Sequence, residues 1–489
     1  MVEPEAFDIL IRDGTIIDGT GASRFAADIG VKDDRIAAIG PLPSARAKRV
    51  VQAMGKVVAP GFIDAHTHDD RALLSHPAMA FKVTQGVTSL IAGNCGVSLA
   101  PFVCPGPPPA SLGLLGAEPG WLRFGRFADY VTALEHLKPA VNCGLLVGHT
   151  TLRYGVLDRL DRPATRAETD AMADKVDEAM EAGAIGFSTG LDYAEAVNSS
   201  FDEVLALVSR ARAHGGLYCS HHRNYFQQVE TALEELFSLG ESSHAPTIIS
   251  HHQVSGRDNH GKAPRTLEMI EAARARTPLG LDVYPYAASS KTLDPDRARQ
   301  GVRILITWSS SHPEMAGREL ADIAAEWQLS GKEAAERLLP GGAIYFQLDE
   351  SDVRAILRYP HTMIGSDGLP HDIFPHPRLW GTFPRVLGHY SRDEGLFPLE
   401  EAVRRMTSLP AAWFGFADRG VLRAGNYADL VVFDPETVID RSTFLRPTEP
   451  AFGIELVVCN GKVTAEKGQA TGIGAGRVLR RDPGLTPWP

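Results

Sequence analysis

Cysteines and long apolar runs are scarce in this chain, and each shortage excludes a class of protein. Five cysteines scattered over 489 residues are too few for a disulfide framework, which suits a reducing compartment. No stretch approaches the roughly 20 apolar residues that a membrane helix needs. The N-terminus, MVEPEAFDIL, has no basic segment followed by an apolar one, so we expect no signal peptide. These absences predict a cytoplasmic protein without a membrane partner.

Excess positive charge is also missing. The formal net charge is −11, which argues against nucleic acid as a partner. The hydrophobic share of 44% and the charged share of 22% are ordinary for a globular protein. Because 489 residues exceed what one hydrophobic core supports, the length predicts two or three domains.

Both ends of the chain have the pattern of β-structure. Short apolar runs alternate there with hairpin-turn dipeptides, such as Asp-Gly at 13–14 and Asn460-Gly461. The middle of the chain has a different pattern. We therefore predict one discontinuous β-sandwich, whose halves (residues 1–60 and 416–489) flank an inserted domain.

The middle, residues 61–415, alternates strands with helices. Alternation of this kind predicts a parallel sheet with crossover helices, and eight such units close a (β/α)8 barrel. One interval, about 287–343, is too long for a simple crossover, so we predict an inserted lid subdomain over the barrel mouth. The eight candidate strands end at 62–65, 89–92, 143–147, 185–188, 217–220, 247–250, 281–284 and 363–365.

His66-Thr67-His68 directly follows the first of these strands. Side chains two residues apart in an extended strand lie on the same face. His66 and His68 can therefore share one metal ion, although two unrelated histidines in a turn would give the same pattern.

Further metal-ligand residue types fall at the other strand ends. The carboxyl ends of all eight strands converge at the mouth of a barrel, so we predict a metal site there. Strand alternation lets only one member of each histidine pair face the axis, and it does not decide which one. His149 either lines the pocket or holds a loop. The other four cysteines are interpreted as structural. The candidate ligands are Cys95, His149, His221 or His222, His251 or His252, and Asp367.

Asp367 is the best candidate for the catalytic base. A carboxylate at the end of strand eight can take a proton from a metal-activated water and pass it to a leaving nitrogen. The alternative is a structural aspartate that caps the turn before Gly368.

Several motifs carry a family resemblance: PGFIDAHTHDD, QGVTSLIAGNCG, GFSTGLDY, ISHH and IGSDGLPHD. Over essentially the whole chain they resemble the amidohydrolase superfamily, and within it the D-aminoacylases, which are zinc-dependent N-acyl-D-amino-acid deacylases. Many two-metal amidohydrolases carry a carboxylated lysine at the end of strand four, but strand four here, AIGFSTG, has no lysine. In D-aminoacylases a cysteine after strand two is a ligand instead, and Cys95 matches it.

The resemblance also implies a ligand set and selects the first histidine of each pair. A tight zinc ion would be held by Cys95, His221 and His251. A second, weaker metal position would use His66, His68, the shared Cys95 and Asp367.

The implied substrate contacts lie nearby. Arg378, after strand eight, suits a bidentate clamp for an α-carboxylate and matches the arginine of the family. Tyr193, Tyr284 and Ser290 match further polar contacts. Gln253 stands where D-aminoacylases often carry a lysine. No extra cation for an acidic side chain can be placed from the sequence.

We therefore expect a zinc-dependent hydrolase that cleaves N-acyl-D-amino acids to a carboxylate and the free D-amino acid, favouring neutral hydrophobic side chains. Its partner is a small molecule, and its state is a monomer or a small homo-oligomer. One alternative is a cyclic-amide hydrolase of the hydantoinase or dihydroorotase kind, which the missing strand-four lysine disfavours. Another is a catalytically inactive scaffold with this fold, which the complete ligand set disfavours.

Overall fold

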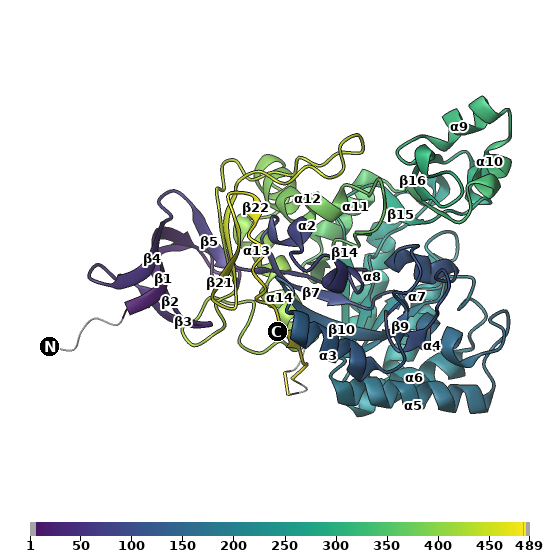
Figure 1. Ribbon diagram of the computed structural model, residues 1–489, viewed down its shortest axis with the longest axis horizontal. Coiled ribbons are helices and arrows are strands. Elements are labelled where there is room, and N and C mark those ends of the chain that lie inside the picture. Colours follow the sequence, from purple (N-terminus) through teal and green to yellow (C-terminus); the bar gives the residue numbers. More distant parts are fainter. Residues whose placement is uncertain (1–5, 483, 486–489) are drawn as a thin grey trace.

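The middle of the chain forms a barrel of eight parallel strands in a computed structural model, which describes residues 6–482 and 484–485 (Figure 1). A backbone hydrogen bond from Ala65 N to Ile364 O (3.1 Å) joins the first strand to the last. The predicted barrel and its eight strands are confirmed. In spatial order they are β18 (Thr362–Ile364), β14 (Leu279–Val283), β13 (Thr247–Ile249), β12 (Leu217–His221), β11 (Gly186–Gly190), β10 (Asn142–Gly148), β7 (Val87–Ala92) and β6 (Phe62–Asp64).

Helices connect and cover these strands. Helix α5 begins with a capping box in which the Thr165 hydroxyl accepts from Glu168 N, and it ends at Gly183, whose φ of 110° suits glycine. The helices around the barrel are α1 (Ala72–Ser75), α2 (Ala80–Val83), α3 (Phe127–Leu137), α4 (His149–Val156), α5 (Arg166–Ala182), α6 (Phe201–Ala213), α7 (Val229–Ser243), α8 (Ala263–Arg274), α11 (Glu350–Arg358), α12 (Arg378–Arg385), α13 (Leu399–Met406) and α14 (Ser408–Phe414). A small ribbon, β8 (Phe102–Val103) with β9 (Arg123–Phe124), lies between β7 and α3 in the sequence.

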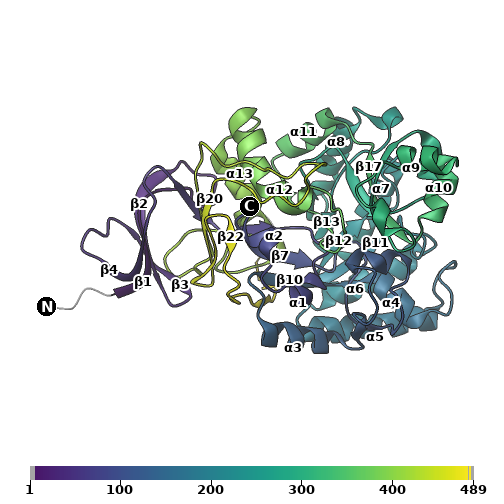
Figure 2. The ribbon, with the colours of Figure 1, turned by 45° about the horizontal axis from the view of Figure 1, so that its top comes forward.

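The long interval after β14 folds into a subdomain with a small core of its own. Its sheet has the order β15-β17-β16, and two short helices pack beside it. The elements are β15 (Ser289–Thr292), β16 (Arg303–Ser309), α9 (Leu320–Trp327), α10 (Gly331–Arg337) and β17 (Gly341–Phe346). Figures 1 and 2 show α9 and α10 at the end of the molecule opposite the terminal strands.

Strands from both ends of the chain share one nine-stranded mixed sheet with a separate apolar core. Leu430 lies opposite Pro60 in an antiparallel pair, so the two ends meet directly. The strands are β1 (Ala6–Ile16), β2 (Phe25–Lys32), β3 (Arg35–Gly40), β4 (Arg46–Gln52), β5 (Val57–Pro60), β19 (Leu430–Phe433), β20 (Ile454–Cys459), β21 (Lys462–Glu466) and β22 (Gln469–Ala470).

The last strand, β23 (Val478–Leu479), lies outside this terminal sheet and pairs with β10 of the barrel. The exact domain boundaries stay a prediction. Among the described residues, no helix combines the length and apolar character required to cross a membrane.

Candidate active site

Metal-ligand side chains meet at the carboxyl ends of the barrel strands. Two groups have all their ligand atoms within 4.8 Å of one another: one is His66, His68 and Cys95, and the other is Cys95, His221 and His251. All five residues are buried, and Cys95 belongs to both groups. The structure thus brings together the predicted ligands, with one thiol between two sets of imidazoles.

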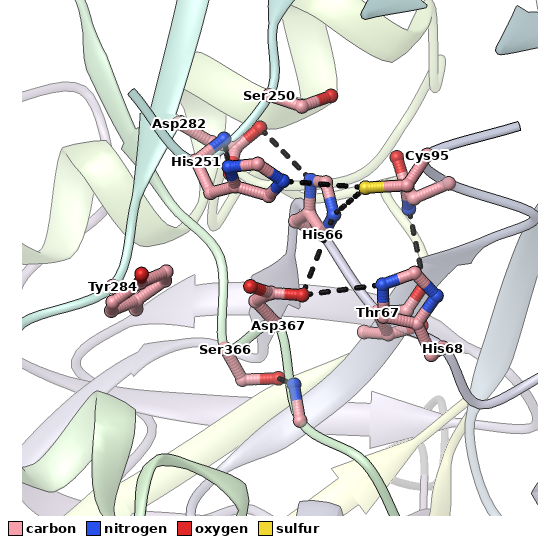
Figure 3. Close-up of polar contacts among 12 residues, drawn as sticks. His66, Thr67, His68, Cys95, Ser250, His251, Asp282, Tyr284, Ser366 and Asp367 are labelled. Carbon is pink, nitrogen blue, oxygen red and sulfur yellow. Dashed lines mark hydrogen bonds and ion pairs between the residues drawn. The ribbon is translucent and has the colours of Figure 1, made fainter. Parts of the chain in front are cut away.

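Cys95 is the centre of this arrangement (Figure 3). Its Sγ lies 3.2 Å from His66 Nε2 and 3.3 Å from His251 Nε2. Burial alone would raise the pKa of the thiol, but the neighbouring His66 and His251 lower it well below its ordinary value. The backbone φ angles of Cys95 (54°), His251 (34°) and Asp367 (49°) are positive, which is strained for non-glycine residues and is common at functional sites.

The second histidine of each pair turns away from Cys95. His252 Nε2 lies 2.9 Å from Thr266 Oγ1, and the ring of His222 packs on Tyr225 at 3.9 Å between centroids. His149, at the start of α4, contacts a different partner, Glu203 in the first turn of α6 (2.9 Å). The structure therefore places His221 and His251, and neither His222 nor His252, beside the thiol.

Asp367 lies next to the first imidazole pair. One carboxylate oxygen, Oδ1, is 3.2 Å from His68 Nε2 and 3.7 Å from His66 Nε2. The other, Oδ2, is 2.9 Å from Nη1 of the completely buried Arg378. Burial opposes ionisation, but Arg378 and the histidines hold the pKa of Asp367 below its usual range. The group is therefore a carboxylate, which can accept a proton.

Asp282, near the end of β14, contacts the ring of His66 and the backbone of His251. Its Oδ2 lies 3.4 Å from His66 Nδ1, and its Oδ1 accepts a hydrogen bond from His251 N (2.9 Å). Carboxylates in this position fix the ring orientation of metal-binding histidines. The sequence did not single out Asp282; its place at the end of a candidate strand, two residues before Tyr284, was the available signal.

This donor set fits a zinc ion. Both ring nitrogens of the buried His221 lack a hydrogen-bond partner among the described residues, as does Nδ1 of His251. Buried polar atoms are normally satisfied, so these nitrogens are available to bind a metal ion. A lowered-pKa thiol with imidazole nitrogens is the donor chemistry that zinc prefers.

The predicted substrate contacts lie around a cavity above the metal-ligand group. Tyr193, Gln253, Tyr284 and Ser290 line it together with Asp367. The Tyr284 hydroxyl donates a hydrogen bond to Gln253 Oε1. These five side chains form a polar lining at the barrel mouth.

Arg378 is held between this lining and Asp367. Its guanidinium lies 4.4 Å from the centre of the Tyr284 ring, and its Nη2 donates to Ser290 O (3.2 Å). The structure thus places the predicted carboxylate clamp against the predicted base, and its contact with substrate stays a prediction.

Three charged residues of the cavity were missed from the sequence. Lys291 Nζ lies 2.9 Å from Asp192 Oδ2, and Nη2 of Arg297 lies 3.8 Å from the same oxygen. Asp192 comes directly before Tyr193, and Lys291 directly follows Ser290. Adjacency to a predicted contact was therefore a signal for Asp192 and Lys291, but not for Arg297.

Known proteins resemble this chain over nearly its whole length. The model of the Amidohydrolase family matches residues 49–257 and 254–465. A D-aminoacylase of Alcaligenes xylosoxydans xylosoxydans is 52% identical over 98% of this chain and 99% of its own.

Two solved structures are also similar. The crystal structure of a D-aminoacylase has a TM-score of 0.95 at 52% identity, over 97% of this chain and 100% of that one. An N-acyl-D-glutamate deacylase from Bordetella bronchiseptica, complexed with zinc and a phosphonate mimic of the tetrahedral intermediate, has a TM-score of 0.94 at 46% identity, with the same coverage. The chain is therefore a hydrolase of the amidohydrolase family, and within that family it belongs to the D-aminoacylases.

Proposed function

We propose that the protein hydrolyses N-acyl-D-amino acids to a carboxylate and the free D-amino acid, with zinc as its cofactor. The observation that carries the proposal is the position of Cys95 between two imidazole groups, with Asp367 beside them. The names of the similar proteins, a D-aminoacylase and an N-acyl-D-glutamate deacylase, support this substrate class.

The residues that would hold metal follow from the two groups. Cys95, His221 and His251 would hold the tight zinc, and His66, His68, Cys95 and Asp367 would form the weaker second position. Bound zinc supplies polarisation of the amide carbonyl and a lower pKa for water.

Asp367 is the proposed general base and acid. Its carboxylate would accept the proton of the attacking water and later deliver it to the leaving nitrogen. Arg378 and His68 keep that carboxylate in one orientation by contacting its two oxygens separately. Because both oxygens are held, the proton-accepting atom has a fixed place relative to the thiol and the imidazoles.

Binding of the amino-acid part would use the polar lining of the cavity. The buried Ser290 hydroxyl has no hydrogen-bond partner among the described residues, so it can donate to a ligand. Arg378 supplies the positive charge for the α-carboxylate, with Tyr193, Tyr284 and Gln253 around it. We propose neutral hydrophobic side chains, such as those of leucine, methionine and phenylalanine, as the preferred ones.

The test measures zinc content and amine release together. We expect the zinc-loaded protein to release amine, detected with ninhydrin, from N-acetyl-D-methionine and not from its L enantiomer. Cys95→Ser should lose both zinc and activity, whereas Cys459→Ser, at an equally buried cysteine of the terminal sheet, should keep both. If zinc-loaded protein releases amine from no N-acyl-D-amino acid, the proposal is wrong.

A further inference from the structure

Two cationic side chains line the cavity and could attract an acidic substrate, Lys291 and Arg297. Both already face the carboxylate of Asp192. We propose that Asp192 masks Lys291 and thereby makes the enzyme reject N-acyl-D-amino acids with anionic side chains. On this reading the preference for uncharged side chains depends on one ion pair, and removing the charge of Asp192 converts the enzyme toward acidic substrates. The inference rests on the proposed function.

The pair joins the barrel to the inserted subdomain. Asp192 lies just after β11, and Lys291 lies in β15. Their side chains are 23% and 18% exposed, and Asp192 Oδ2 is also 3.7 Å from His221 Nε2. The pair is therefore within reach of a substrate whose amide lies at the metal-ligand group.

The same two residues separate two spaces. They line the inner cavity with His221, and they also line an outer cavity of about 770 Å³ whose other walls include Leu293 and Trp308. A substrate side chain that extends from the inner toward the outer cavity has to pass this ion pair. Its charge therefore interacts with Asp192 and Lys291 before it reaches water.

Neighbouring charges leave no spare cation at this wall among the described residues. Arg297 lies 3.3 Å from Asp294 in addition to its contact with Asp192. Arg378, which contacts Asp367, is occupied by the α-carboxylate of the substrate in the proposed function. An anionic side chain would have to lose its hydration and compete with Asp192 for Lys291. An uncharged side chain meets neither cost. Asp192 and Lys291 therefore determine specificity by disfavouring anionic side chains, not by attracting uncharged ones.

The experiment compares specificity ratios in the zinc-loaded protein. The ratio is kcat/KM for N-acetyl-D-glutamate divided by kcat/KM for N-acetyl-D-methionine. Asp192→Asn should raise it at least about tenfold, because the substrate carboxylate then takes the place of Asp192 beside Lys291. The double variant Asp192→Asn with Lys291→Met should return the ratio close to that of the wild type.

Asp296→Asn is the matched control. It removes the same charge from another lysine pair of the inserted subdomain, Asp296 with Lys332 (2.9 Å), whose carboxylate is 72% exposed. The control should leave the ratio unchanged. An unchanged ratio in folded, zinc-loaded Asp192→Asn would overturn the proposal, and so would an equal rise in the double variant. Preference of the wild type for N-acetyl-D-lysine would overturn it too, since Asp192 would then recognise substrate.

Direct binding separates this proposal from the proposed function. If the wild type cleaves no N-acyl-D-amino acid, the function is wrong, and calorimetric titration with free D-glutamate and D-methionine still tests the ion pair. Asp192→Asn should bind D-glutamate at least about tenfold more tightly than the wild type does, with a gain that shrinks as salt is added. No gain in binding would contradict the masking of Lys291.

Discussion

Two lysine–aspartate pairs of equal length lie in the two main regions of the molecule. In the barrel, Lys82 Nζ is 2.7 Å from Asp64 Oδ2, and both side chains are completely buried. In the terminal sheet, Lys56 Nζ is 2.7 Å from Asp434 Oδ2, with side chains 29% and 19% exposed. Equal distances thus occur in very different surroundings, and the surroundings decide what each pair contributes.

The barrel pair is part of a network behind the active site. Lys82 also donates to Ser366 Oγ (2.7 Å) and lies 3.1 Å from Asp69. Asp64 in turn accepts from Ser366 N (2.8 Å). This network connects the end of β6 to Ser366, which follows β18 and directly precedes Asp367. The buried Lys82 therefore helps to position the proposed base. The pair of the terminal sheet, Lys56 with Asp434, instead connects the residue before β5 to the residue after β19.

The largest difference between the regions should appear in catalysis. Asp367→Ala should lower kcat by about three to four orders of magnitude, because it removes the proton acceptor, while the tight zinc remains bound. Asp434→Ala removes an aspartate of the terminal sheet and should keep full activity. Steady-state rates and zinc content check both variants, and retained activity of Asp367→Ala would place the base elsewhere.

The next difference concerns stability. Lys82→Met should lower the free energy of unfolding by about 3–4 kcal/mol, because it leaves two buried aspartates without their cation. Denaturant titration followed by circular dichroism measures this value. A loss below 1 kcal/mol would show that the buried pair contributes no more than a surface pair, and the comparison between the regions would fail.

A second buried charge in the barrel predicts a pH dependence. Burial alone would raise the pKa of Glu203, but His149, Ala164 N and Arg153 hold it at about 2. Since the unfolded value is near 4.5, the ionised native state gains stability that is complete above pH 4.5 and lost as the pH falls toward 2.

Glu203→Gln is the variant that checks this linkage. The stability advantage of the wild type over the variant should shrink by about 3 kcal/mol between pH 6 and pH 2. Unfolding of both proteins is measured in the presence of a chelator, so that loss of zinc at low pH does not contribute to the difference between them. An advantage that stays constant with pH would mean that Glu203 is not depressed in pKa.

The smallest effect belongs to the terminal sheet. Lys56→Met should change the free energy of unfolding by less than about 1 kcal/mol, because a partly exposed ion pair is weak in water and is screened by salt. The same denaturant titration as for Lys82→Met gives the value. A loss of 3 kcal/mol here would remove the distinction between the two regions.

Much of the fold could be predicted from the sequence because the barrel repeats one local pattern. Each strand is a short apolar segment. The metal-ligand residue types directly follow these segments, at the carboxyl ends of the strands, which converge at the mouth of the barrel. Cys95 and the His66-Thr67-His68 motif could be found in this way. The resemblance to a family supplied the chirality of the substrate and the choice within each histidine pair.

Other parts of the site could not be predicted, for physical reasons. β13 ends at Ile249, and the positive φ of His251 interrupts the alternation that would have decided between His251 and His252. Asp192 and Lys291 are 99 residues apart and meet only because the inserted subdomain packs on the barrel. Local sequence patterns carry no information on such a long-range contact. The position of Lys291 in the cavity could therefore be found only from the three-dimensional structure.

The meeting of β5 with β19 has a consequence for how the protein is made. Leu430 pairs with Pro60, so 370 residues (430 minus 60) separate the partners. At about 5–20 residues per second, a ribosome needs roughly 20–75 s to deliver β19 after β5. During that time β5 has an unpaired edge in the newborn chain, open to pairing with other chains. Until synthesis is nearly complete, this edge is therefore a place at which the newly made chain can aggregate.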